Sequence, residues 1–252
     1  MTMEEELLSL REENARLHVM QQEYEEYIRS TFGRYLTNEV LEQILSDRGQ
    51  LSIGGERRVV SIMFTDLRRS TELSEQMDAD DFIRMLNHFL EEMIEIINAW
   101  QGNILEFVGD AIVVVFGAPR RNAFSARDAA ACAVAMQRRM RAINDWNRAQ
   151  GYSEIAMGIG LHTGEAILGN IGSETRTKYD MIGRNVNLAS RVQGYTTGGQ
   201  ILATSELLAA AGSQVIVNEA GSMRVSPKGI QEPIVLHEII GYGTQRLDTG
   251  LP

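Results

Sequence analysis

The pattern of apolar and polar positions predicts an amphipathic helix at the N-terminus of the chain. Apolar residues and two polar ones follow each other at alternating spacings of three and four, which is an a/d heptad seam: Leu7, Leu10, Asn14, Leu17, Gln21, Tyr24 and Ile28. Asn14 at an a position lowers stability but favours a parallel dimer, because Asn pairs with Asn across the axis. We expect a parallel coiled coil over residues 1–31. A single solvated helix is the alternative, since the seam is short.

A junction follows over residues 32–55. Thr37 is positioned to cap a short helix that runs to Leu45, and Asp47-Arg48-Gly49 is a sequence that ends helices.

Strand-like and helix-like periods then alternate over residues 56–242, and residues 243–252 form a tail. The first predicted elements are a strand at Arg58–Phe64, a helix at Asp80–Trp100, a hairpin at Gly102–Phe116 and a helix at Ala123–Arg148. A strand at Ile155–Leu161 follows, then a turn at His162-Thr163-Gly164 and a short run to Ile171. The last elements are a segment at Tyr179–Gly183 with a helix to Gln193, and short strands around one helix at Ile201–Ile240. This order predicts an α+β fold of the ferredoxin-like kind.

Composition restricts the location and the partners of the protein. The chain has 252 residues, a net charge of -10 and one cysteine, Cys132. An acidic chain is a poor match for nucleic acid or an anionic membrane surface. No signal peptide and no apolar run of about 20 residues is found, so we expect a cytoplasmic protein. Cys132 lies in an apolar helical stretch, which indicates a buried structural thiol.

Two aspartates stand at the ends of apolar strands. Asp110 is at the tip of the predicted hairpin, beside Gly109, and Asp66 follows the strand Arg58–Phe64. A carboxylate at such a position costs free energy unless a cation or hydrogen bonds satisfy it. If the two strands are neighbours, both carboxylates enter one acidic pocket with the ligands that Mg²⁺ prefers.

Four sequence pieces together resemble the catalytic domain of the class III nucleotidyl cyclases. They are FTDLRRST at Phe64–Thr71, EFVGDAIVVVF at Glu106–Phe116, GIGLHTGEAILGNIG at Gly158–Gly172 and YDMIGRNVNLASR at Tyr179–Arg191, with SPKGIQEPIVLHEI at Ser226–Ile239 as a weaker fifth. The resemblance implies a ferredoxin-like domain that works as a head-to-tail homodimer with active sites at the interface. It also implies cyclisation of a nucleoside triphosphate with loss of pyrophosphate. A further hypothesis, compatible with this one, makes the N-terminal helix a signal-transmitting coiled coil and the chain an output module.

The resemblance assigns roles to individual residues. Asp66 and Asp110 would bridge two divalent cations, Mg²⁺ or Mn²⁺, with help from the backbone carbonyl of Leu67. The partner chain would supply Asn187 to orient the ribose and Arg191 to stabilise charge on the α-phosphate. The spacing of four places these two on one helix face independently of any family. The remaining assignments are triphosphate contacts for Arg176 and Lys228 and a structural strand-end role for His162.

The two base-selecting positions are mixed. Family members that use ATP typically carry Lys and Asp there, and guanylyl cyclases typically carry Glu and Cys, whereas this chain has Glu106 and Asp180. Glu106 would accept hydrogen bonds from guanine and repel the N1 lone pair of adenine, while Asp180 suits the adenine amino group. This logic ranks GTP first, ATP second and a pyrimidine triphosphate such as UTP third. A nucleotide-binding regulatory module that turns over poorly is the alternative of another class.

Overall fold

The structure is a computed structural model that describes residues 3–33, 40–41, 45, 53–227 and 232–247. Contacts divide the chain into two compact units, residues 1–51 and residues 52–252. None of the helices in the described ranges is long and apolar enough to cross a membrane.

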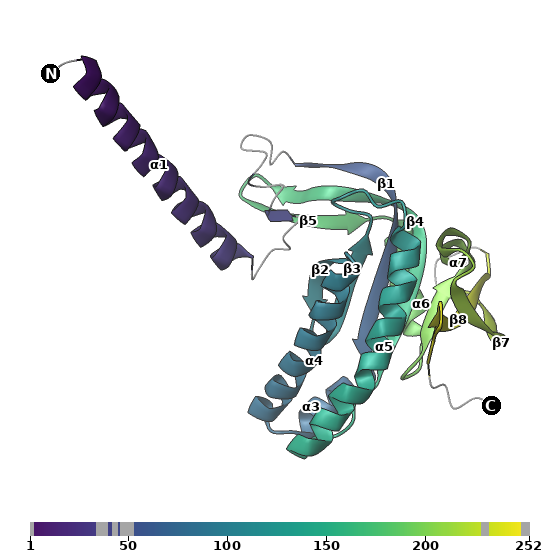
Figure 1. The fold of residues 1–252 in the computed structure, drawn as a ribbon. Coiled ribbons are helices and arrows are strands. Elements are labelled where there is room, and N and C mark those ends of the chain that lie inside the picture. Colours follow the sequence, from purple (N-terminus) through teal and green to yellow (C-terminus); the bar gives the residue numbers. More distant parts are fainter. Residues whose placement is uncertain (1–2, 34–39, 42–44, 46–52, 228–231, 248–252) are drawn as a thin grey trace. The chain divides into compact units, whose positions relative to one another are not determined.

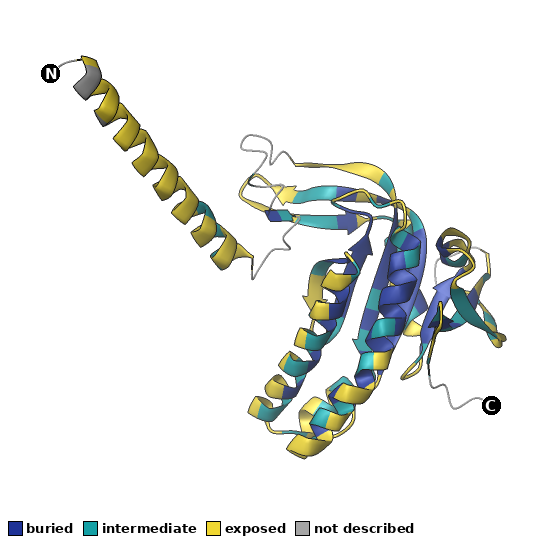
Figure 2. Cartoon of the chain, in the orientation of Figure 1, coloured by how far each residue is buried: buried dark blue, intermediate teal, exposed yellow. Residues whose placement is uncertain are grey.

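The first unit contains the predicted N-terminal helix, α1, which spans Met3–Phe32 (Figure 1). Nearly all of its described side chains are exposed in the single chain (Figure 2). The seam leucines are among them, with Leu7 52%, Leu10 59% and Leu17 53% exposed. Because these leucines are exposed, packing within the chain contributes little to the stability of the helix. The parallel coiled coil, which would bury them, stays a prediction. The predicted helix from Thr37 to Leu45 lies largely outside the described residues.

The second unit is built on one large sheet. Its strands are β1 (Gly54–Leu67), β2 (Asn103–Val108), β3 (Ala111–Phe116), β4 (Met157–Ser173), β5 (Arg176–Ile182), β6 (Ile201–Thr204), β7 (Val215–Val225), β8 (Ile234–Tyr242) and β9 (Gln245–Arg246). The strand order is β2-β3-β1-β4-β6-β8-β7, with β5 paired to β4 and β9 to β8. β1 lies between β3 and β4 and is antiparallel to both. The order β2-β3-β1-β4 with helical crossovers confirms the expected ferredoxin-like α+β fold.

Helices α4 (Ala79–Ala99) and α5 (Ser125–Gln150) pack against one face of the sheet, and α3 (Ser70–Gln76) precedes them (Figure 1). The Asp78 side chain caps α4 by accepting a hydrogen bond from the Asp80 N–H at 3.0 Å. The helix expected at Asp80–Trp100 is confirmed as α4, and its buried side consists of Met85, Phe89, Met93, Ile96 and Ile97. Burial of each such side chain contributes about 1.5–3 kcal/mol. Cys132 is fully buried in α5, as expected, and this burial raises the pKa of its thiol.

The other face of the sheet carries a second core under β5 and α6 (Arg184–Gly194). Val60 and Ile62 of β1 pack there with Met181 and Ala189. α7 (Ser205–Ala211) follows β6. The two cores fix β1 from both sides, so its C-terminal end is held rigidly.

The predicted turn at His162-Thr163-Gly164 is wrong, because β4 runs without interruption through these residues. β4 pairs with β1 along its whole length, from Leu67 opposite Met157 to Gly54 opposite Asn170, and His162 lies opposite Ile62. Glycine in this segment serves close packing instead. A Cβ at Gly164 would come within 2.6 Å of the Asn185 side chain, and one at Gly160 within 2.2 Å of the Gln193 backbone nitrogen, so α6 lies directly on β4.

Candidate active site

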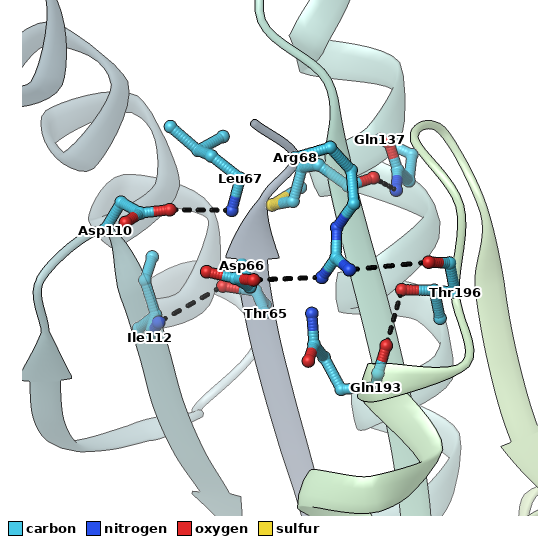
Figure 3. A network of polar contacts seen from close by, with 10 residues as sticks. Thr65, Asp66, Leu67, Arg68, Asp110, Ile112, Gln137, Gln193 and Thr196 are labelled. Atoms are coloured by element: carbon cyan, nitrogen blue, oxygen red, sulfur yellow. Dashed lines mark hydrogen bonds and ion pairs between the residues drawn. The ribbon is translucent and has the colours of Figure 1, made fainter. Parts of the chain in front are cut away.

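Asp66 and Asp110 meet at the end of β1. Thr65 pairs with Ile112 in the β1–β3 ladder, and its hydroxyl accepts a hydrogen bond from the Ile112 N–H at 3.3 Å. Gly109 takes a positive φ of 65° in the turn between β2 and β3, which brings Asp110 beside β1. Asp110 Oδ2 then accepts a hydrogen bond from the Leu67 N–H at 2.9 Å (Figure 3). The strand ends are neighbours, as the sequence predicted.

The electrostatic environment of the Asp66–Asp110 pair favours the binding of a cation. Burial raises the pKa of Asp66, and the negative charge of Asp110 raises it further. The guanidinium of Arg68 acts in the opposite direction through an ion pair with Asp66 at 3.1 Å. A divalent cation between the carboxylates would stabilise both ionised forms more strongly than one guanidinium does.

The donor set fits a magnesium-type ion. In the described part of the chain, no group of three or more His, Cys, Asp or Glu residues is arranged to hold a metal. Mg²⁺ is usually bound by one or two carboxylates together with waters and substrate phosphates, not by an all-protein cage. Asp66 and Asp110 supply the two carboxylates. Leu67 follows Asp66 in the chain, and its N–H donates to Asp110 Oδ2.

Arg68 is a residue at this site to which sequence reasoning gave no role. Its side chain is only 25% exposed, and its Nη1 donates to the Thr196 carbonyl oxygen at 3.5 Å (Figure 3). The Arg68 Nε and the Gln193 Nε2 are buried and have no hydrogen-bond partner among the described residues. The two consecutive arginines after Asp-Leu in FTDLRRST were the available signal. Arg68 therefore compensates the charge of Asp66 when no cation is bound.

Asn187 and Arg191 lie on α6, where Leu188, Ala189 and Val192 form the buried side. Asn187 is exposed and Arg191 half-buried. Within the described residues, neither side chain makes a hydrogen bond or an ion pair. Two polar side chains four residues apart are thus available to a molecule outside this chain.

Glu106 and Asp180 are brought together by a residue that the sequence reading missed. The Lys178 ammonium on β5 lies 2.9 Å from Glu106 Oε2 on β2 and 3.4 Å from Asp180 Oδ2. Partial burial lowers the pKa of Lys178, but the hydrogen bond that its ammonium donates to Glu106 and the negative charge of Asp180 outweigh this effect, and the net pKa is raised. Lys178 thus stays charged and neutralises part of the charge of both carboxylates.

The other predicted residues do not join these clusters. Arg176 is exposed where the β4–β5 hairpin turns, opposite Ser173 in the ladder. Lys228 lies outside the described residues. His162 is buried inside β4 and not at a strand end, so its predicted position is wrong although a structural role fits. Its ring nitrogens lie 2.8 Å from Thr204 Oγ1 and 3.1 Å from Asn185 Oδ1.

Paired aspartates at the end of β1 and a polar α6 face on a ferredoxin-like sheet define a nucleotidyl cyclase catalytic domain. Residues 55–241 match the family described as the adenylate and guanylate cyclase catalytic domain. The chain belongs to this family.

Solved structures and curated relatives agree with this assignment. The chain is similar to the guanylyl cyclase Cya2, with 43% identity and a TM-score of 0.73 over 76% of this chain and 96% of that one. It is also similar to the adenylyl cyclase CyaB from P. aeruginosa, with 31% identity and a TM-score of 0.72 over 76% of this chain and 98% of that one. Adenylate cyclase 1 of Rhizobium meliloti (strain 1021) is 29% identical over 213 residues, which are 84% of this chain and 32% of the relative. An uncharacterized protein of Mycobacterium bovis is 30% identical over 223 residues, or 88% of this chain and 39% of the relative. The chain thus spans 32% to 39% of the length of these curated relatives.

Proposed function

We propose that the chain converts a nucleoside triphosphate, with GTP preferred, to the 3′,5′-cyclic monophosphate and pyrophosphate at the interface of a homodimer. The observation that carries this proposal is the Asp66–Asp110 pair, in which burial and like charge raise the pKa of Asp66. Two divalent cations, Mg²⁺ or Mn²⁺, would lower the pKa of the ribose 3′-hydroxyl and neutralise the leaving pyrophosphate. Asp66, Asp110 and the Leu67 carbonyl would hold these ions.

The dimer is required because each chain contains two separate parts of the site. Asn187 and Arg191 have no partner in the described part of their own chain, so we assign them to the substrate of the opposite chain's aspartates. Asn187 would orient the ribose so that the 3′-oxygen is in line with the α-phosphorus. Arg191 would stabilise the charge that develops on the α-phosphate oxygens. We keep Arg176 and Lys228 as proposed contacts of the β- and γ-phosphates.

Base selection rests on Glu106, Lys178 and Asp180 acting together. Glu106 would accept hydrogen bonds from the guanine N1–H and N2–H groups, and the Lys178 ammonium would donate to O6. This removes the difficulty that Asp180 poses for guanine, because Lys178 already neutralises that carboxylate at 3.4 Å. The likeness to the guanylyl cyclase Cya2, at 43% identity, also supports GTP.

ATP is the second candidate, and Asp180 is the observation that favours it. An Asp180 released from Lys178 would accept a hydrogen bond from the adenine N6 amino group, although Glu106 would still face the N1 lone pair. The likeness to the adenylyl cyclase CyaB, at 31% identity, supports this alternative. A pyrimidine triphosphate ranks third, since uracil offers N3–H to Glu106 and O4 to Lys178 on a smaller ring.

The test is to incubate the protein with each of the four ribonucleoside triphosphates and Mn²⁺ and to identify the products by mass. We expect cyclic GMP to form with a kcat/KM at least about tenfold above that for ATP. No cyclic product from any triphosphate would overturn the proposed activity. A preference for ATP would leave the cyclase activity standing and overturn the role of Glu106.

A further inference from the structure

A cavity of about 540 Å³ lies behind the end of β1, on the side of α5. Its walls come from α5, the first residues of β4, the glycines Gly198 and Gly199 before β6, and β9. This volume is in the range of small-molecule sites, which is roughly 300–1,000 Å³. Of the residues assigned to the metal, the ribose, the phosphates or the base, none that the structure describes lines it.

The charged residues that line the cavity have one sign. Arg138 and Arg141, three residues apart on one face of α5, line the cavity together with Arg246 of β9. No acidic side chain is among the described lining residues, and in the described part of the chain none of these three arginines forms an ion pair. Other arginines of the same helix differ, since Arg139 pairs with Glu92 and Arg148 with Asp145. Three cations left without carboxylates are notable in a chain with a net charge of -10.

Among the lining side chains, the guanidinium groups are the available hydrogen-bond donors. The Gln137 amide already donates to the Met157 carbonyl oxygen at 2.8 Å, and the Asn144 amide to the Ile155 carbonyl oxygen at 2.9 Å. Met140 and Leu247 add apolar surface. Guanidinium groups suit phosphate oxygens, because their paired N–H donors match the geometry of an oxyanion.

We propose that this cavity binds a small phosphorylated molecule, with its phosphate held by Arg138, Arg141 and Arg246 and its remainder on the apolar wall. The site is separate from the proposed active site but adjoins it through the backbone. Met157 pairs with Leu67 in the β1–β4 ladder, and the Arg68 N–H donates to the Ala156 carbonyl oxygen at 2.7 Å. Both Met157 and Ala156 line the cavity, so a ligand there contacts the segment that positions Asp66 and Arg68. An effect of the ligand on turnover would rest on the proposed function, whereas the binding itself does not.

The test measures binding of pyrophosphate to the whole chain by isothermal titration calorimetry, with a chelator present and no nucleotide. We expect Arg138→Gln with Arg141→Gln, and separately Arg246→Gln, to weaken binding about tenfold or more, because each removes a charged donor. Arg148→Gln is the matched control, since this arginine lies on the same helix outside the cavity and should leave the affinity unchanged.

Two results would overturn the proposal. One is an unchanged pyrophosphate affinity in the cavity variants, together with loss of binding in Arg191→Ala. This result would place the anion at the proposed catalytic residues instead. The other is no detectable binding to the wild-type chain at about 10 mM pyrophosphate. Because no turnover is measured, failure here is distinguishable from failure of the proposed activity.

Discussion

Lys178 on β5 contacts Glu106 on β2, with 2.9 Å between the ammonium nitrogen and the carboxylate oxygen. These strands are not neighbours in the sheet, because β5 pairs only with β4 and β2 only with β3. The same ammonium lies 3.4 Å from Asp180, so the two carboxylates that we propose to select the base share one cation. They therefore act as one unit, and changing either alters the electrostatic environment of the other.

Removing the shared cation should change the choice of base. In Lys178→Gln, O6 of guanine loses a charged donor, and Glu106 and Asp180 repel each other without compensation. We expect kcat/KM for GTP to fall roughly tenfold or more and the ratio of GTP to ATP use to fall with it. Lys178→Arg keeps the charge and is the matched control. Steady-state rates with all four triphosphates measure the ranking, and an unchanged ranking in Lys178→Gln would contradict the shared-cation interpretation.

Replacing Glu106, the proposed acceptor of the guanine ring N–H, should shift the substrate preference further from GTP toward ATP. Glu106→Lys alone places a second ammonium beside Lys178, so we combine it with Lys178→Gln. Asp180 is then free for the adenine amino group, and the new lysine is positioned to donate to adenine N1. We expect ATP to become the preferred substrate, with the GTP-to-ATP ratio changing by about a hundredfold. If the double variant keeps its preference for GTP, base choice depends on pocket shape instead of these side chains.

The sequence predicted the fold and the aspartate pair because both depend on local signals. Strands such as Ala111–Phe116 are continuous apolar runs, and a carboxylate directly next to such a run, as Asp110 is, is expected where the strand ends. The error at His162-Thr163-Gly164 arose because glycine signals a turn as well as close packing, and only the position of Asn185 of α6 beside Gly164 shows which applies.

The roles of Lys178 and Arg68 were not predictable in the same way. Lys178 reaches a strand that is far away in both sequence and strand order, and the ion pair of Arg68 with Asp66 depends on a backbone turn after β1, where Arg69 has a φ of 61°. Long charged side chains have many rotamers, so a pattern of residue types does not determine which partner each one contacts.

Asp66→Asn should abolish turnover without unfolding the domain. The substitution removes a ligand of both proposed cations, and we expect a loss of about a thousandfold in kcat. The raised pKa of Asp66 means that its ionised form is less favourable in the folded than in the unfolded chain, so near neutral pH the metal-free variant should melt no lower than the wild type. Thermal unfolding with a chelator and activity with Mn²⁺ check the two parts. Substantial activity in the purified variant would contradict the two-metal assignment.

Mixing two inactive variants should restore activity if the site is shared between chains. A heterodimer of Asp66→Asn and Asn187→Ala chains has one intact site, because the intact aspartates of one chain meet the intact Asn187 of the other. Free exchange of chains should give about a quarter of wild-type activity. Each variant alone is the control. Inactivity of a heterodimer of confirmed composition would show that both groups act within one chain.

Stability should fall on acidification because of His162, which is buried and neutral in β4. Burial lowers the pKa of His162, and its hydrogen bond to Asn185 opposes this only partly. The unfolded chain has an ordinary histidine pKa of about 6.5, so it takes up a proton before the folded chain does. As the pH falls through this value, the unfolded state is favoured, by at most about 1.4 kcal/mol per pH unit, until the lower folded pKa is reached.

His162→Gln removes this titration while keeping an amide that is able to bond with Thr204 and Asn185. Urea unfolding between about pH 7.5 and about pH 5.5 should show a smaller loss of unfolding free energy in His162→Gln than in the wild type. Near pH 7.5 the variant should be less stable by about 1–2 kcal/mol, since the amide fills the ring's space poorly. His18→Gln, on the exposed surface of α1, is the control and should retain the wild-type slope. Equal slopes for His162→Gln and the wild type would mean that His162 accepts its proton in the folded chain as readily as in the unfolded chain.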